Sequence, residues 1–254
     1  MDNKIKLDNI AIVLVEPQIP ENIGSAARAM NNMGLKKLIV VAPGNFDIGI
    51  VLKTATHNSI HILEEMDVVD DLLEGIGEYN YIVGTTARTG KYRSVLATPR
   101  KLAKQLISIS QNNKIAILFG REDRGLTNEH LRYCHTIVKI PTATPTSLNL
   151  AQAVMIMCYE IYMTSIDEDA VISYVPRLAN RFELEGMYEH LKRALIKIGF
   201  IDPKNPEHWM WNIRKMLSRY PLQAKEVQII RGICRQIEWF AEQKSKEQNI
   251  SDPS

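Results

Sequence analysis

Three segments of this chain combine small residues with charged or amide side chains, which suits the binding of a phosphate or another polar ligand. They run from Glu16 to Arg28, from Phe119 to Leu126 and from Ile140 to Ala151. In the first segment, the small residues 24–27 would let a ligand or another chain approach closely, and Arg28 could hold a phosphate through two hydrogen bonds. A capped helix with a surface arginine explains the same residues equally well.

The second segment places four charged residues between Gly120 and Gly125, directly after an apolar run. Ligands of open α/β sheets bind beyond the carboxyl ends of the strands, so a loop of this kind suits a binding site. A charged turn that needs glycine for a positive φ is the alternative. The chain contains neither the G-x-x-x-x-G-K-[ST] phosphate loop nor the G-x-G-x-x-G pattern of dinucleotide-binding folds.

The third segment is stiffened by Pro141 and Pro145, and either Ser147 or Asn149 could cap the helix expected after it. Free N–H groups at such a helix start could receive a polar ligand, although an ordinary proline-rich connection fits as well. The six histidines show no spacing typical of a metal-binding motif such as H-E-x-x-H, so we expect no metal site.

The elements that would position these segments follow from the periodicity of apolar residues. Apolar runs rich in β-branched residues predict strands at 10–15, 38–41, 81–83, 115–119 and 137–140. Amphipathic stretches predict helices at 22–33, 68–76, 99–109 and 148–163, the first of them ended by Gly34. Strands that are apolar throughout and alternate with helices are typical of a mainly parallel sheet covered on both faces.

The pattern changes after Ser165. Acidic residues followed by a Val-Pro pair predict a linker over 166–178, and no strand candidate follows it. Apolar spacing predicts helices at about 184–198 and 222–243, and Asn205 with Pro206 predicts the start of another. We therefore expect an α/β domain over 1–165 and a small all-helical domain over 179–254. Its tryptophans are expected in the core, and base stacking is the less favoured alternative; they are Trp209, Trp211 and Trp239.

The composition is that of a globular protein, because 45% of the 254 residues are hydrophobic and 24% are charged. The net charge is only +2, which gives no strong field for nucleic acid or membranes. Residues 179–254, however, hold 13 basic and 10 acidic side chains, a net of +3, against −1 for residues 1–178. Three scattered cysteines and the lack of an 18-residue apolar run lead us to expect a cytoplasmic protein without a membrane partner.

Taken in this order, the three segments resemble the three motifs of the SPOUT class of RNA methyltransferases. The matching stretches are Asn22–Arg28, Ile117–Glu122, and Ile140-Pro141 with Ser147–Ala151. Residues 179–254, which we call the tail, show a second resemblance, to the C-terminal extension of TrmJ-type tRNA 2′-O-methyltransferases. The matching residues are His208–Arg219, Glu226 and Ile229–Ile233. Thr85–Arg88 resembles a stretch found in that family between the first two motifs.

The resemblance implies a deep trefoil knot in the α/β part and a homodimer whose active site forms at the subunit interface. It also implies transfer of a methyl group from S-adenosylmethionine, without a metal, to a ribose 2′-hydroxyl. The target would be nucleotide 32, cytidine or uridine, in the tRNA anticodon loop. A SpoU-type methyltransferase acting on another tRNA position or on ribosomal RNA is the alternative, and an RNA-binding protein without catalysis is a more distant one.

By position, the resemblance assigns catalysis to Arg28, with Asn22 beside it and Glu122 organising the site. Arg28 would either take the hydroxyl proton or, because a guanidinium is a weak base, grip the neighbouring phosphate and polarise the hydroxyl. The cofactor would contact, mainly through backbone groups, Thr85, Thr86, Ala87, Gly120, Ile140, Ser147, Leu148 and Asn149.

We expect Arg28 and the basic tail to bind the tRNA, because neutralising phosphates supplies much of the affinity for nucleic acid. The basic candidates in the tail are Arg214, Lys215, Arg219 and Arg231, together with His208 and Arg235. A second expectation concerns the dimer: the small residues Gly24, Ala26 and Ala27 would pack between the two subunits.

Overall fold

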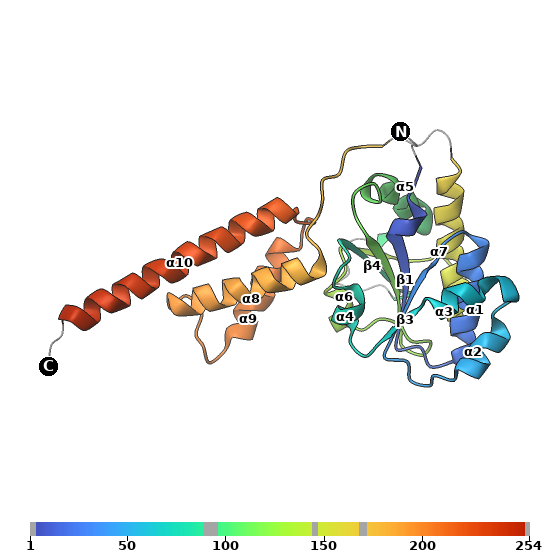
Figure 1. Ribbon diagram of the computed structural model, residues 1–254, viewed down its shortest axis with the longest axis horizontal. Helices are drawn as coiled ribbons and strands as arrows, with labels where there is room; N and C mark the ends of the chain where they lie inside the picture. Colours follow the sequence, from blue (N-terminus) through green and yellow to red (C-terminus); the bar gives the residue numbers. More distant parts are fainter. Residues whose placement is uncertain (1–3, 89–95, 144–146, 168–171, 252–254) are drawn as a thin grey trace. The chain divides into compact units, whose positions relative to one another are not determined.

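The computed structural model describes residues 4–88, 96–143, 147–167 and 172–251. The chain divides into two compact units, Met1–Pro176 and Arg177–Ser254 (Figure 1). Part of the predicted linker, residues 168–171, and part of the third segment, residues 144–146, lie outside the described residues.

A parallel sheet forms the centre of the first unit. In the described residues it has seven strands in the order β3-β2-β1-β6-β4-β7-β5, and every neighbouring pair is parallel. This confirms the expected α/β class with a mainly parallel sheet, whereas the trefoil knot stays a prediction. The strands are β1 (Ile10–Val15), β2 (Lys37–Val41), β3 (Asp67–Val69), β4 (Tyr81–Thr85), β5 (Leu96–Ala97), β6 (Ile115–Phe119) and β7 (Thr136–Val138).

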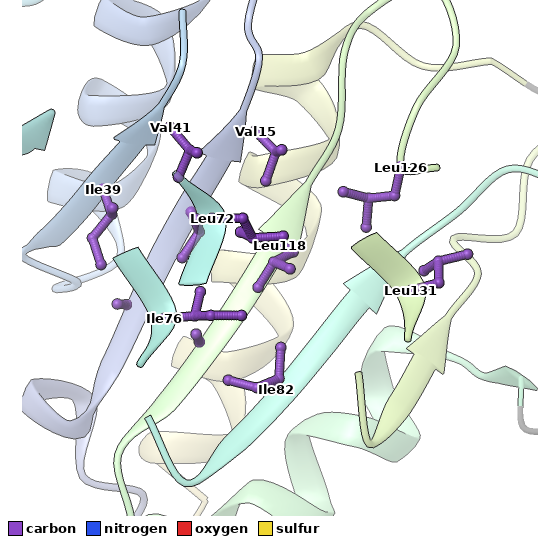
Figure 2. Packing of buried hydrophobic residues seen from close by; sticks show 12 residues of the cluster. Val15, Ile39, Val41, Leu72, Ile76, Ile82, Leu118, Leu126 and Leu131 are labelled. Atoms are coloured by element: carbon purple, nitrogen blue, oxygen red, sulfur yellow. The ribbon is translucent and has the colours of Figure 1, made fainter. Parts of the chain in front are cut away.

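Helices cover both faces of this sheet (Figure 1). On one face, α1 (Pro20–Asn32) packs beside α7 (Leu150–Ser165), which also contacts α5 (Pro99–Ile109). On the other face, Leu72 and Ile76 of α4 (Leu72–Ile76) pack against alternate residues of the central strands (Figure 2). The remaining short helices are η1 (Leu7–Asn9), α2 (Ile48–Thr54), η2 (His57–Ser59), α3 (Ile60–Glu64) and α6 (Asn128–Leu131).

The helix predicted over 68–76 is wrong in its first half. Residues 67–69 form β3 instead, because Val68 and Val69 pair with Val40 and Val41 of β2 and extend the sheet by one strand. The helix begins only at Leu72, after Asp71, whose side chain accepts hydrogen bonds from two N–H groups of the first turn. A three-residue edge strand is defined by its neighbour in space, which the local periodicity does not reveal.

Smaller differences concern the ends of elements. The first helix begins at Pro20, so that Asn22 lies inside its first turn rather than capping it. Gly34 follows this helix with a φ of 73°, as its role in ending the helix requires. The strand predicted to reach Ile140 ends at Val138. Of the two candidate caps for the last helix of this unit, Asn149 is the one that caps it.

The second unit consists of α8 (Arg181–Lys197), α9 (Pro206–Leu217) and α10 (Ala224–Ser251). Among its described residues there is no strand beyond a single bridge between Leu178 and Gln223, so this part is helical, as expected. Its core is formed by Ala179, Leu184, Met187, Tyr188, Ile201, Met210 and Val227. The tryptophans are not in it, which makes that expectation wrong: Trp209, Trp211 and Trp239 are 45%, 41% and 57% exposed. Within the described residues, no helix is both long and apolar enough to span a membrane.

Candidate active site

Four neighbouring strands bring the predicted site residues to one edge of the sheet. The strands β1, β6, β4 and β7 are adjacent and parallel, so that their carboxyl ends lie at the same edge. Asn22 follows β1, Thr85 ends β4, Gly120 follows β6 and Ile140 follows β7. The segments that the sequence singles out therefore meet where ligands of α/β sheets bind.

Glu122 fastens the second segment to the start of α1. Its carboxylate accepts hydrogen bonds from the backbone N–H of Gln18 (2.9 Å) and of Ile19 (3.3 Å), and from Nδ2 of Asn22 (2.7 Å). A negative charge is favourable at this end of a helix, where N–H groups point outward without partners. Sequence reasoning missed Gln18 and Ile19, because they take part through their backbones.

Asn22 continues the connection to the third segment. Its side chain is 6% exposed, and its Oδ1 accepts a hydrogen bond from Nδ2 of Asn149 (2.9 Å). The Oδ1 of Asn149 in turn accepts from the N–H groups of Ala151 (2.9 Å) and Gln152 (3.3 Å), which caps α7. Because a carboxylate can only accept hydrogen bonds, Asn22 must turn its NH2 group toward Glu122. The Oδ1 of Asn22 then faces Asn149, and this fixes the orientation of the Asn149 amide as well. We call this arrangement the Glu122–Asn22–Asn149 chain.

Arg28 lies apart from this chain. Most of α1 is buried, and its exposed or half-exposed stripe has helical spacing: Glu21, Ser25, Arg28 and Asn32. Among the described residues, the Arg28 guanidinium makes neither a hydrogen bond nor an ion pair. It is therefore available to an anionic ligand.

The other charges of the second segment form ion pairs within this segment or with Glu16 of the first segment. Arg121 binds Asp123 through two hydrogen bonds of 2.9 and 3.0 Å, which raise the pKa of Arg121 and lower that of Asp123. Arg124 donates to Glu16 (2.7 Å), a residue held at a φ of 52°. These residues stiffen the loop, and Glu122 is the one whose carboxylate reaches α1.

Both glycines of this segment are required by the loop itself. A Cβ on Gly120 would lie 2.2 Å from the backbone carbon of Gly125 and 2.2 Å from the nitrogen of Leu126. Gly125 has a φ of 63°, as the charged-turn alternative expects. The substitution Gly120→Val would therefore disturb the loop before it obstructed a ligand.

The remaining predicted cofactor residues end β4 or follow β4 and β7 along the chain. Thr85 donates its hydroxyl to the carbonyl of Leu118 (2.8 Å), and the N–H of Thr86 donates to the carbonyl of Val138 (2.9 Å). Of the others, Ala87 and Ser147 are exposed, and Ile140 and Leu148 are half-buried. Among the described residues, no cluster of three or more His, Cys, Asp and Glu side chains could hold a metal.

The expectation that Gly24, Ala26 and Ala27 pack between subunits is wrong. Ala26 and Ala27 are fully buried within one chain. A Cβ on Gly24 would lie 2.1 Å from the carbonyl oxygen of Val51 and 2.2 Å from Oγ1 of Thr54, so this glycine allows α2 to pack against α1. The small residues serve the packing of the subunit itself.

The predicted basic residues of the tail differ in how free they are. Arg214 donates to Glu185 (2.7 Å) and lies 4.2 Å from the ring centre of Tyr188. Arg231 is half-buried, whereas Arg219 and Arg235 are exposed. The Nζ of Lys215 lies 4.9 Å from the ring centre of Trp211.

Comparison with known proteins gives two family matches. Residues 9–159 match the SpoU rRNA Methylase family, and residues 182–249 match the C-terminal domain of the tRNA methyltransferase TrmJ. The tRNA (cytidine/uridine/adenosine-2′-O-)-methyltransferase TrmJ of Pseudomonas aeruginosa is 38% identical over 247 residues, which cover 92% of this chain and 96% of that protein. The tRNA (cytidine/uridine-2′-O-)-methyltransferase TrmJ of Pectobacterium atrosepticum is 36% identical and covers 91% and 98%.

A solved structure supports the same relationship. The crystal structure of TrmJ from Z. mobilis matches with a TM-score of 0.76 at 31% sequence identity, and the match covers 90% of this chain and 98% of that one.

Proposed function

Because this chain belongs to the SpoU methylase family, and within it to the TrmJ-type tRNA 2′-O-methyltransferases, we propose that it methylates the ribose 2′-hydroxyl of nucleotide 32 in the tRNA anticodon loop. The methyl donor is S-adenosylmethionine, and the nucleoside is cytidine or uridine. One observation carries this proposal: the Glu122–Asn22–Asn149 chain ties the three motif segments into one site. Since tRNA is the substrate, we place the enzyme in the cytoplasm.

The residues around the ends of β4, β6 and β7 suit S-adenosylmethionine. They offer backbone groups beside small or half-buried side chains, which fits a ligand with an apolar body and several polar groups. Thr85–Ala87, Gly120, Ile140 and Ser147–Asn149 would hold it. The cofactor supplies an electrophilic methyl group on a sulfonium, and this chemistry requires no metal.

The roles of the polar residues follow from their contacts. The Glu122 carboxylate already accepts three hydrogen bonds from the start of α1, and Asn22 is buried between Glu122 and Asn149. Both are therefore positioning residues, which fix the helix that carries Arg28. The Arg28 guanidinium, which is unpaired among the described residues, binds the phosphate next to the target ribose and polarises the 2′-hydroxyl. The hydroxyl proton passes to that phosphate or to water.

The homodimer uses the outer face of α7. Tyr159 and Met163 of α7 and Ile166, which caps its end, follow one another at helical spacing and are 46%, 41% and 48% exposed. A helix that is apolar on its outer face is typical of an interface. Because α1 and α7 pack side by side, a second subunit on α7 lies next to the exposed stripe of Arg28, and the active site is then completed by both subunits.

The tail supplies affinity for tRNA, since residues 179–254 carry a net charge of +3. In this role, residues 1–165 form the methyltransferase domain and 179–254 the tRNA-binding extension, joined by 166–178. Of the basic candidates, Lys215, Arg219 and Arg235 are exposed and contact phosphates directly. Arg214, which is paired with Glu185, and the half-buried Arg231 add positive charge beside them.

Nucleoside mass spectrometry tests this function. The purified protein is incubated with S-adenosylmethionine and unmodified tRNA, and 2′-O-methylated nucleosides are measured and mapped by nuclease digestion. We expect 2′-O-methylcytidine or 2′-O-methyluridine at position 32, and adenosine is tested by placing it there. Ribose methylation only at another position, or only of ribosomal RNA, would instead support the SpoU-type alternative.

A further inference from the structure

The outer face of α9 carries aromatic and basic side chains together. His208, Trp211, Asn212 and Lys215 follow one another at i, i+3, i+4 and i+7, which places them on one side of the helix, and all four are exposed. Met210, on the opposite side, is buried in the core of the second unit. We call these four residues the α9 face.

The aromatic rings at and beside this face are held in place by contacts with neighbouring side chains. The Lys215 ammonium lies over the Trp211 ring, 4.9 Å from its centre, which is within the range of a cation–π contact. On the flank of the face, Trp209 contacts Phe200 and His208, with ring centres 5.5 and 6.3 Å apart. Because these contacts limit their motion, the rings lose little conformational entropy when a flat ligand stacks on them.

The charge at this face is positive and uncompensated. Its nearby carboxylate, Glu207, is paired with Lys192 of α8 at 2.7 Å. By contrast, Lys215 of this face and Arg219, which follows the end of α9, have no carboxylate partner within the described residues. Exposed aromatic rings beside cations that have no described carboxylate partner suit a ligand with both π-faces and negative charge, and single-stranded nucleic acid has both.

We propose that unpaired bases of the tRNA stack on the α9 face, with Trp211 as the platform and Lys215 and Arg219 holding the adjacent phosphates. This inference rests on the proposed function, since it takes tRNA as the ligand. It adds a mode of recognition: the tail distinguishes unpaired loop nucleotides from double-stranded RNA, whose bases are not available for stacking.

The test measures binding of unmodified tRNA to the full-length protein by fluorescence anisotropy, without S-adenosylmethionine. Trp211→Ala should raise the Kd by about 5- to 100-fold, and Trp211→Phe should restore most of the affinity, because phenylalanine still stacks. The slope of log affinity against log salt should not change in Trp211→Ala. In Lys215→Gln the magnitude of this slope should fall by about one, which corresponds to the loss of one phosphate contact.

The control is Trp239→Ala, which removes a tryptophan of similar exposure from α10 and should leave the Kd unchanged. A second measurement uses a fully paired RNA duplex, which wild type and Trp211→Ala should bind equally weakly. Wild-type tRNA affinity in a folded Trp211→Ala would overturn the proposal, even if the enzyme methylates tRNA. Conversely, loss of tRNA affinity in this variant supports the proposal even if no methyl transfer is found, in which case only the proposed function fails.

Discussion

Arg28 is the residue that we expect to matter for the reaction and not for the stability of the fold. Its side chain is exposed, and among the described residues its guanidinium forms neither a hydrogen bond nor an ion pair. We predict that Arg28→Ala lowers kcat for methyl transfer at least about 100-fold, the size expected for loss of a group that moves a proton or stabilises charge. The melting temperature should change by less than about 2 °C, as for other surface substitutions.

The control for this variant is Glu21→Ala, which alters the same exposed stripe of α1 about two turns away. It should retain activity. A folded Arg28→Ala with wild-type kcat would show that the transfer does not depend on this guanidinium.

A second prediction at this scale concerns the cofactor. Ala87 is exposed at the end of β4, so a larger side chain there meets the ligand rather than the protein core. We predict that Ala87→Phe weakens S-adenosylmethionine binding at least tenfold in isothermal titration, because the ring occupies the proposed site. Lys104→Phe, at an exposed position of α5, is the matched control and should bind normally.

The sequence could identify the residues of the site but not their connections. Asn22, Glu122 and Asn149 stand out by type and by motif. Their hydrogen bonds join positions 100 and 127 residues apart, however, and such partners depend on the assembled sheet. The requirement for glycine at position 120 could not be predicted either. The backbone that a Cβ would meet there lies close only because the loop folds back on itself.

At the scale of elements, Gly24 determines how closely α1 and α2 approach. We predict that Gly24→Ala lowers the free energy of unfolding by about 1–3 kcal/mol, because its Cβ would meet the backbone of α2 and force the helix outward. A thermal melt should show a decrease of several degrees. Ser25→Ala, at the half-exposed neighbouring position, should melt close to wild type, and equal melting of both variants would contradict this account.

The start of α8 gives a prediction about pH. Arg177 donates two hydrogen bonds to Glu183 and holds the pKa of that carboxyl below its ordinary value, and the N–H of Asn180 adds to the effect. Since the pKa is lower in the folded state, the carboxylate stabilises the fold above the ordinary value of about 4.3. That contribution is lost as the pH falls through the lower folded-state pKa.

Glu183→Gln should therefore reduce the free energy of unfolding by about 1 kcal/mol at pH 7, the usual size of a capping contribution. Thermal melts of both proteins should converge as the pH drops below about 4. A difference that stays constant down to pH 3 would mean that the carboxylate charge is not what stabilises this helix.

Elements with strong local signals were predictable, and those that depend on neighbours were not. The β-branched run Ile10–Val15 forms a strand with the predicted bounds, and Pro99–Ile109 forms a helix with the predicted bounds. In contrast, β3 exists because Asp67–Val69 lies along β2. Trp209 and Trp211, two positions apart, carried a usable signal: on a helix they point about 200° apart, so one core could not bury both.

For the whole molecule, the apolar outer face of α7 predicts the oligomeric state. Light scattering should report about twice the chain mass of 28.9 kDa at micromolar concentration. Tyr159→Glu combined with Met163→Glu should give monomers, since each would bury a charge in the interface, and should abolish methyl transfer because the site is shared. Tyr174→Glu, at a residue 83% exposed outside this face, should stay dimeric and active. An active monomer would contradict the shared site.

The Glu122–Asn22–Asn149 chain also has a consequence for how the enzyme is made. Its hydrogen bonds join residues separated by 100 and 127 positions, so they form only after β1 has paired with β6 and α7 has docked on α1. Contacts so distant in sequence form late in folding, because the chain entropy lost in closing long loops must be offset first. During refolding, the helical signal in circular dichroism should therefore recover before catalytic activity does. On the ribosome, the chain cannot methylate RNA until Asn149 has emerged.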